Sequence, residues 1–147
     1  MTAQENIVPD ASVILKWIFK APNEEHTEQA LVLLDDWIGG RVNLIVPALW
    51  AFEVGNVLGL KSAGLAAETI ALLLEYHFEE QALTVDICRQ AFSIMETCKV
   101  TFYDAAYHAV ALTRSATLLT ADEVYACKTA QIGHIMILKD RQQKYFG

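Results

Sequence analysis

Short apolar runs alternate with helical repeats along this chain. The runs predict strands at residues 7–10, 44–46, 83–85, 117–120 and 134–138. Apolar residues three and four positions apart predict helices at residues 12–19, 24–38, 47–63, 66–77, 87–98, 101–112 and 122–131. This alternation, with an extra helix between the second and third strands, predicts an α/β fold in which helices cover both faces of a mostly parallel sheet of about five strands.

Capping residues refine the helix boundaries. Asn23 is placed to cap the second helix, and Pro47 suits the first turn of the third. Asp86 is expected to cap the helix that begins at Ile87. Residues 101–104 have the spacing of a capping box, which predicts a helix start there.

The length of 147 residues fits one domain, with a core at about 7–138 and a charged tail at 139–147. Hydrophobic residues make up 54% of the chain and the mean hydropathy is +0.27, so we expect some apolar surface to be reserved for a partner. The helix at 66–77 is apolar nearly all round. It is the first candidate for a dimer or partner contact.

Charge and cysteine content narrow the function classes. Cys88, Cys98 and Cys127 are too widely spaced for a zinc motif or an obvious disulfide framework. Glu5 and Asp10 interrupt the N-terminus where a signal peptide needs an apolar run, and no stretch is long and uncharged enough for a membrane helix, so a cytoplasmic protein without membrane contact is expected. A net charge of −7 argues against a passive nucleic-acid-binding module but allows a metal-dependent nuclease.

Four carboxylates stand almost alone in apolar stretches: Asp10, Glu53, Asp104 and Asp122. A carboxylate carried into a core-forming segment must be paired, hydrogen-bonded or metal-bound, because burying it uncompensated costs several kcal/mol. No internal cations match them in the sequence. A bound metal is therefore the leading partner.

The predicted elements bring these carboxylates to one edge of the sheet. Asp10 and Asp122 follow strands, while Glu53 and Asp104 lie near helix starts that face the same edge, where ligands of parallel sheets collect. Ligands that are all oxygen suit Mg²⁺ or Mn²⁺, and a magnesium site with few protein ligands implies phosphate-ester chemistry. The metal could generate the hydroxide nucleophile, so no protein nucleophile is required.

Three polar residues are placed to orient these carboxylates or their waters. They are Ser12, Asn56 and Thr120.

Three of the four carboxylates also have a structural interpretation. Asp10 could cap a helix, Asp104 could complete a capping box, and Asp122 could interact with a helix dipole. Glu53 lies inside an apolar helix, where capping does not fully explain it. The joint pattern therefore favours a shared site over four separate structural roles.

Basic residues near these positions have two interpretations each. His108 could contact substrate, although a lone histidine on an apolar helix more often belongs to the core or an interface. Lys16 and Lys20 could bind phosphates of a substrate, and the basic and aromatic residues of the tail could bind a strand by charge and stacking. Solvated lysines and a frayed terminus are the more common explanations.

The sequence around the four carboxylates resembles the acidic motifs of PIN-domain nucleases, in order. The matching segments are residues 7–12, 47–58, 103–111 and 118–122. Within that family the chain is most similar to VapC-type toxins of toxin–antitoxin pairs.

The resemblance implies a PIN-like three-layer α/β/α fold and a metal-dependent endoribonuclease that dimerises and is silenced by a protein antitoxin. It further implies Asp10 and Asp104 as direct ligands of Mg²⁺ or Mn²⁺, with Glu53 and Asp122 completing the acidic cluster directly or through water.

Two alternatives remain. One is a PIN ribonuclease without an antitoxin. The other is a response-regulator-like phosphoacceptor domain, in which Asp10, Asp86, Thr120 and Lys139 would take the acidic, phosphorylated, switch and lysine positions.

Overall fold

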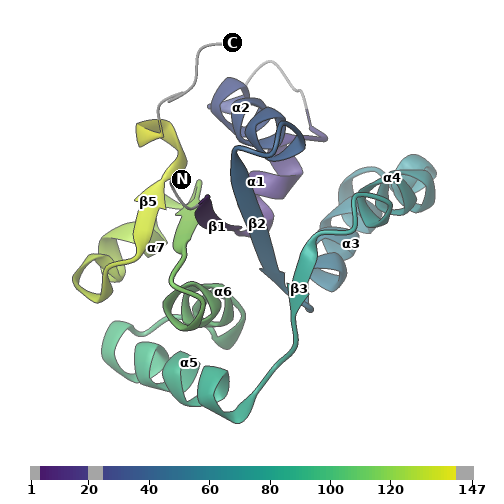
Figure 1. Cartoon of the computed structure of the whole chain (residues 1–147). Coiled ribbons are helices and arrows are strands. Elements are labelled where there is room, and N and C mark those ends of the chain that lie inside the picture. The colour runs from purple at the N-terminus through teal and green to yellow at the C-terminus, as the bar shows by residue number, and fades with distance from the viewer. Residues whose placement is uncertain (1–3, 20–24, 142–147) are drawn as a thin grey trace.

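A five-stranded sheet forms the centre of the molecule (Figure 1). The computed structural model describes residues 4–19 and 25–141. Every strand pair is parallel, and the strand order is β3-β2-β1-β4-β5. The strands are β1 (Glu5–Pro9), β2 (Val42–Pro47), β3 (Glu79–Gln81), β4 (Thr117–Thr120) and β5 (Ile135–Ile137). The predicted α/β fold class is thus confirmed.

Helices connect each strand to the next in the described residues. The α-helices are α1 (Ala11–Lys16), α2 (Thr27–Ile38), α3 (Trp50–Lys61), α4 (Ala66–Leu74), α5 (Val85–Cys98), α6 (Phe102–Thr113) and α7 (Glu123–Lys128). Short 3-10 turns add η1 (Ala63–Leu65), η2 (Ala130–Ile132) and η3 (Leu138–Asp140). Within these ranges no helix is long and apolar enough to cross a membrane.

The direction of the crossovers sorts the helices into two layers (Figure 1). From β1 the chain adds β2 and then β3 toward one edge of the sheet. It then crosses back over β2 and β1 and adds β4 and β5 toward the other edge. Because such connections are right-handed, α1 to α4 lie on one side of the sheet and α5 to α7 on the other. The strand order reverses between β1 and β4, which is where open α/β sheets bind ligands.

The central strands are apolar on both faces because helices cover both. Residues 7–9 of β1 and 44–47 of β2 are buried without interruption, as expected for a parallel sheet. This continuous burial is what made these strands visible in the sequence.

The predicted third strand at 83–85 was wrong. The strand β3 lies earlier and is polar, Glu79-Glu80-Gln81, because it is an edge strand that pairs only with β2. Leu83 and Val85 are exposed, and Thr84 caps α5 by accepting a hydrogen bond from the Ile87 amide at 3.2 Å. Asp86 therefore lies in the first turn of α5 rather than at its cap.

Two other predicted helix starts need comment. Pro47 ends β2, and α3 begins three residues later at Trp50, so Pro47 is not in the first helical turn. Asn23 lies outside the described residues, and the cap position of α2 is occupied by His26.

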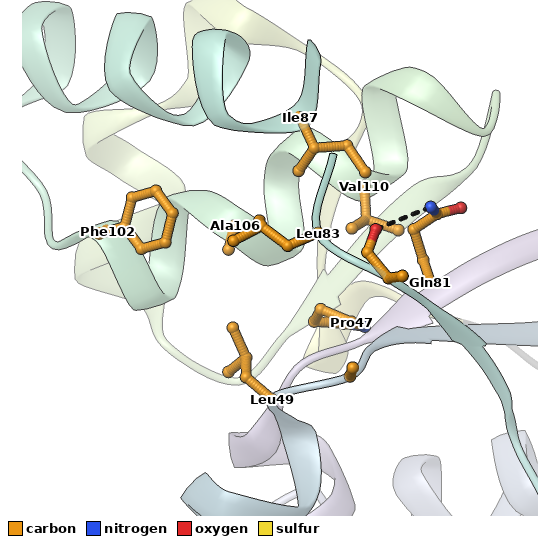
Figure 2. A pocket seen from close by; sticks show the side chains of 10 residues that line it. Pro47, Leu49, Gln81, Leu83, Ile87, Phe102, Ala106 and Val110 are labelled. Carbon is orange, nitrogen blue, oxygen red and sulfur yellow. Dashed lines mark hydrogen bonds between the residues drawn. The ribbon is translucent and has the colours of Figure 1, made fainter. Parts of the chain in front are cut away.

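The link from β3 to α5 borders an apolar pocket (Figure 2). Leu83 from this link faces Leu49 near the start of α3 and Phe102 and Ala106 of α6. No carboxylate lines the pocket, so its chemistry differs from that of the predicted acidic site.

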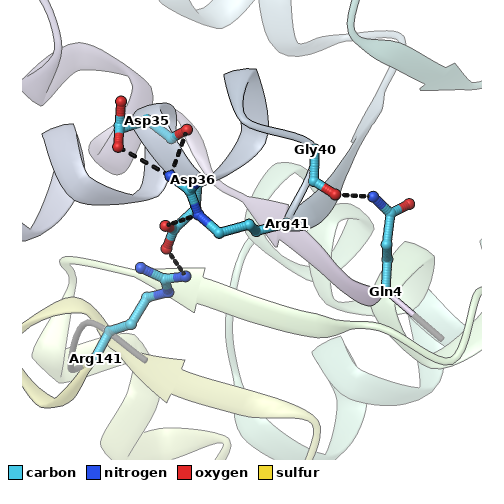
Figure 3. Close-up of polar contacts among 6 residues, drawn as sticks. All are labelled: Gln4, Asp35, Asp36, Gly40, Arg41 and Arg141. Atoms are coloured by element: carbon cyan, nitrogen blue, oxygen red, sulfur yellow. Dashed lines mark hydrogen bonds and ion pairs between the residues drawn. The ribbon is translucent and has the colours of Figure 1, made fainter. Parts of the chain in front are cut away.

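The start of the predicted tail is part of the fold. Residues 138–140 form η3, and Arg141 is buried against α2 (Figure 3). Arg141 Nη2 donates to Asp36 Oδ2 at 2.8 Å, while Arg41 Nε donates to Asp36 Oδ1 at 3.0 Å. A fully buried carboxylate is thus shared by two guanidinium groups, and the prediction of a frayed end is wrong for these residues. Residues 142–147 lie outside the described part of the chain.

Candidate active site

The site begins where β1 and β4 end side by side. The Asp10 amide donates to the carbonyl of Leu119 at 3.1 Å, which fixes the end of β1 against β4. Ser12 joins the ends of the same two strands, where the strand order reverses. Its hydroxyl donates to Asp10 Oδ1 and accepts from the Ala121 amide at 3.0 Å. Two motifs more than 100 residues apart in the sequence are thereby joined at one point.

Asp10 is held at the N-terminus of α1, where its carboxylate accepts from the Val13 amide at 3.3 Å. Burial raises the pKa of Asp10 from 3.8 to about 6. Hydrogen bonds from Ser12, Thr120 and Val13 oppose this rise, and the charge of Asp104 adds to it. The capping interpretation is correct for the local geometry, but it does not account for a carboxylate that is costly to ionise.

Glu53 is positioned by the packing of α3 on the sheet. One turn earlier, Trp50 is buried and packs edge-on against Phe78 with ring centroids 5.2 Å apart, and its Nε1 donates to Glu80 at 2.7 Å. The Oε1 atom of Glu53 is buried and has no hydrogen-bond partner among the described residues. Burial raises the pKa of Glu53, and the charge of Asp104 adds to this rise. The polar side chain of Tyr107 acts in the opposite direction and lowers the pKa.

Tyr107 lies beside Glu53 and was not among the site residues predicted from the sequence. Its hydroxyl is buried without a hydrogen-bond partner in the described structure, and burial together with the charge of Glu53 raises its pKa. The phenol therefore stays protonated near neutral pH. The signal available in the sequence was its position one turn after Asp104 on α6.

Asp104 and Asp122 lie at the open side of the site. The Asp104 amide donates to the Thr101 hydroxyl at 3.2 Å, which confirms the predicted cap of α6. Partial removal from water raises the pKa of Asp104, and Asp122 contributes to the rise. Asp122 caps α7 by accepting from the Tyr125 amide at 3.0 Å. Both keep solvent-exposed surface.

Asp104 links the four predicted carboxylates electrostatically. Its charge raises the pKa of Asp10 and of Glu53, and its own pKa is raised by Asp122. Like charges this close disfavour ionisation unless a cation is present. The structure thus brings all four residues into one electrostatic site.

The donor chemistry fits a divalent cation. A hard cation requires oxygen ligands, and Glu53 offers a buried Oε1 that has no hydrogen-bond partner in the described part of the chain. In the described part of the chain, no three acidic, histidine or cysteine side chains are already close enough to hold a metal together. Magnesium is commonly held by only one or two carboxylates, with water and substrate phosphate completing the shell. The arrangement therefore suits a metal bound together with substrate.

The predicted supporting residues divide into two groups. Ser12 contacts Asp10, and the buried Thr120 accepts from the Asp122 amide at 3.0 Å through its hydroxyl. Asn56 is exposed on α3, and none of the described contacts joins it to Glu53. Its role stays a prediction.

His108 is a core residue. It is fully buried, with Nε2 2.7 Å from the carbonyl of Gly133 and Nδ1 2.9 Å from the Tyr125 hydroxyl. Since a carbonyl only accepts, Nε2 carries the proton and Nδ1 accepts from the phenol. Burial lowers the pKa of His108. The core interpretation of this residue is confirmed.

Tyr125→Phe is expected to lower the free energy of unfolding by about 1–3 kcal/mol, because His108 Nδ1 loses its donor in a buried position. Urea unfolding monitored by circular dichroism measures this change. Tyr103→Phe on α6 is the matched control, since Tyr103 is 61% exposed. Equal stability of the two variants would show that the His108 contact contributes nothing.

Comparison with known proteins agrees with this fold. A family model of the PIN domain matches residues 7–130. Among the curated proteins, no match was found.

Three solved structures illustrate the likeness. A toxin–antitoxin complex from Klebsiella pneumoniae is 17% identical with a TM-score of 0.66, covering 90% of this chain and 97% of that one. VapC20 of Mycobacterium tuberculosis, a sarcin-ricin loop cleaving toxin, is 16% identical with a TM-score of 0.61, covering 82% and 94%. PAE2754 from Pyrobaculum aerophilum is 26% identical with a TM-score of 0.61, covering 92% and 90%.

The chain belongs to the PIN-domain family, since the family model spans most of its length. The predicted resemblance is confirmed. The assignment supports the predicted activity in its general form, a nuclease that hydrolyses nucleic acid.

Proposed function

We propose that this protein is an endoribonuclease that depends on Mg²⁺ or Mn²⁺ and acts as the toxin of a VapBC-type pair in the cytoplasm. The observation that carries the proposal is the gathering of Asp10, Glu53, Asp104 and Asp122 at the sheet edge, where Glu53 Oε1 is buried and has no hydrogen-bond partner among the described residues. The family assignment and the structural likeness to VapC20, a sarcin-ricin loop cleaving toxin, support it.

The carboxylates would hold the metal as the sequence motifs suggest. Asp10 and Asp104 would bind it directly, and Glu53 and Asp122 directly or through water. When bound, a divalent ion supplies hydroxide near neutral pH and neutralises charge on phosphate oxygens.

Other side chains of this protein keep the carboxylates in place. Ser12 and the Val13 amide hold one face of Asp10. Tyr107 keeps its proton and is available to donate to Glu53. Such contacts fix the orientation of metal-binding carboxylates.

Cleavage of labelled RNA by the purified protein should require added Mg²⁺ or Mn²⁺ and stop in EDTA. Gel electrophoresis of total RNA and of a single-stranded oligonucleotide measures this dependence. Matched reactions with DNA of the same sequence test the preference for RNA. Full RNA cleavage in EDTA would refute the metal mechanism.

Divalent metal should also raise the melting temperature of the wild-type protein, because it offsets repulsion among the carboxylates. Thermal unfolding with and without millimolar Mn²⁺ measures the shift. Asp104→Asn should reduce the shift strongly, while Asp140→Asn on η3 should retain it. An equal shift in both variants would place the metal elsewhere.

An antitoxin and a second copy of this chain are the proposed protein partners. Exposed apolar side chains on α3, η1 and α4 support a partner surface, as predicted for residues 66–77. These include Leu60, Leu65 and Leu72. The Klebsiella pneumoniae structure is a toxin–antitoxin complex, which supports the antitoxin. A small antitoxin gene beside this one is expected; without it, the alternative of a PIN ribonuclease lacking an antitoxin is favoured.

The phosphoacceptor alternative is not favoured. Asp86 is an exposed residue of α5 paired with Arg89 at 3.2 Å, and Lys139 is paired with Glu123 at 2.7 Å. The strand β3 that precedes Asp86 pairs only with β2 at the sheet edge, away from β1 and Asp10. Acid-labile phosphate on Asp86 after treatment with acetyl phosphate would reverse this ranking.

A further inference from the structure

Asp104 and Asp122 reach the same surface groove from two different helices. Asp104 lies in the first turn of α6, and Asp122 caps α7. Both carboxylates line the groove between the starts of these helices. Burial raises the pKa of Asp104, and the charge of Asp122 adds to the rise. The separation of the two carboxylates therefore depends on how α6 and α7 are held relative to each other.

The main chains of α6 and α7 contribute little to this arrangement. The helix α7 packs chiefly on β5 (Figure 1) and on η2, and its main chain makes little contact with α6. Among the described residues, one hydrogen bond joins the two helices directly. The Tyr125 hydroxyl donates to Nδ1 of His108 at 2.9 Å. This pair of side chains is thus the direct polar link between the helices that carry Asp104 and Asp122.

Each partner of this hydrogen bond lies about one helical turn from one of the carboxylates. His108 follows Asp104 by four residues on α6, so the two side chains lie on the same side of that helix. Tyr125 is in the first turn of α7, and its amide donates to the Asp122 carboxylate at 3.0 Å. A displacement of either ring would therefore move the carboxylate on the same helix.

The link is buried and held at both ends. His108 is fully buried, and Tyr125 is only 4% exposed. Nε2 of His108 donates to the carbonyl of Gly133 at 2.7 Å, and the Thr129 hydroxyl donates to the carbonyl of Tyr125 at 2.9 Å. Because both ring nitrogens of His108 are hydrogen-bonded, the tautomer and the orientation of the imidazole are fixed. The ring can therefore act as a rigid spacer between the two helices.

We propose that the hydrogen bond between His108 and Tyr125 positions Asp104 and Asp122 relative to each other and thereby sets the affinity of the acidic site for Mg²⁺ or Mn²⁺. Neither ring needs to touch the metal, so both are positioning residues. The inference rests on the proposed function, which places the two carboxylates in one metal site. Mg²⁺ demands near-ideal octahedral geometry, whereas Ca²⁺ accepts a flexible set of oxygen ligands. A loosened pair of carboxylates should therefore lose Mg²⁺ more readily than Ca²⁺.

Metal affinity of the full chain tests this role. Electron paramagnetic resonance of free Mn²⁺ measures Mn²⁺ binding, and competition against Mn²⁺ measures the binding of Mg²⁺ and Ca²⁺. Tyr125→Phe removes only the hydroxyl of the link, and His108→Leu removes its acceptor. All proteins are compared at a temperature at which circular dichroism shows each of them to be folded.

Two controls separate positioning from a general loss of stability. Asn43→Ala removes a hydrogen bond of 3.1 Å to Asn6 near the amino ends of β2 and β1, away from the carboxylates. Tyr103→Phe removes a phenol hydroxyl from α6 at an exposed position. Both variants should bind the three ions as the wild-type protein does.

Tyr125→Phe should raise the dissociation constants of Mn²⁺ and Mg²⁺ about tenfold, the lower end of the effect of losing a residue that supports metal ligands. The constant for Ca²⁺ should rise by less than about threefold, because its ligand geometry is less strict. His108→Leu, where it folds, should act in the same direction. Equal changes for Mg²⁺ and Ca²⁺, or an effect of Tyr125→Phe no larger than that of Asn43→Ala, would overturn the positioning role.

The same titration distinguishes failure of this inference from failure of the proposed function. Asp104→Asn should remove most of the Mn²⁺ binding. If it does so while Tyr125→Phe binds like the wild-type protein, only the positioning role is wrong. If the wild-type protein binds no Mn²⁺, or if Asp104→Asn binds it equally well, the metal site of the proposed function is wrong and the positioning role is overturned with it.

Discussion

Asp10→Asn should reduce the rate of metal-dependent RNA cleavage by about 100-fold or more. The same substitution should raise the melting temperature of the metal-free protein. The activity is lost because an amide is a poor ligand for the cation that supplies several kcal/mol of transition-state stabilisation. The fold is kept because an asparagine caps a helix as well as an aspartate does and still accepts from Ser12 and Val13.

The gain in stability follows from the sign of the pKa change. The pKa of Asp10 rises from 3.8 to about 6 on folding, so above pH 6 the folded state carries the full cost of a buried charge. Wild-type stability relative to Asp10→Asn should therefore rise as the pH falls from 6 to 4, and the difference at pH 7.5 should be about 1–3 kcal/mol.

Thermal unfolding of both proteins in EDTA from pH 4 to pH 8 measures this difference. Asp86→Asn is the control, because Asp86 is exposed on α5 and should change neither activity nor stability appreciably. A variant at position 10 that is less stable than wild type at pH 7.5, with no pH dependence, would contradict the burial of an ionised carboxylate.

Asp36→Ala should destabilise the protein by about 3–5 kcal/mol, because it leaves buried arginine charge uncompensated. Asp36 is fully buried and binds both Arg41 and Arg141 (Figure 3), and the Arg141 side chain is only 5% exposed. Removing the carboxylate would leave the buried Arg141 guanidinium beside α2 without Asp36 as its ion-pair partner, and would weaken the packing of η3 and Arg141 on α2.

The neighbouring Asp35 provides a matched control for this substitution. It lies on the same helix and also pairs with Arg41, but its side chain is 74% exposed. Asp35→Ala should cost less than about 1 kcal/mol by chemical unfolding. Similar losses in the two variants would show that burial of the Asp36 cluster does not contribute to stability.

The grouping of the four carboxylates could be largely predicted from sequence because each is a charged residue within an apolar segment. Charges inside apolar segments are visible without a structure, and Asp10, Glu53, Asp104 and Asp122 do lie in one coupled site. Glu53 was expected to be the hardest to explain by capping. It is also the residue whose buried oxygen has no partner in the described structure.

The central strands were predictable for a similar reason, since strands covered on both faces are continuously apolar. The edge strand β3 was not, because its side chains Glu79 and Glu80 are exposed and carry no apolar signal. The apolar Leu83 and Val85 nearby gave the wrong position.

Long-range contacts account for the remaining differences. The burial of Arg141 depends on Asp36, which is 105 residues away in sequence, and nothing local distinguishes this arginine from a solvated tail. Tyr107 was missed because an apolar ring at helical spacing looks like ordinary core. Only the fold shows its hydroxyl beside Glu53.

Asp10, Glu53, Asp104 and Asp122 should together form one metal site for RNA cleavage. A crystal structure of the protein grown with Mn²⁺, examined by anomalous diffraction at the manganese edge, tests it most directly. We expect an anomalous peak next to the carboxylates of Asp10 and Asp104, with Glu53 and Asp122 around it. A manganese-replete crystal of an active protein with no peak at these residues would contradict it.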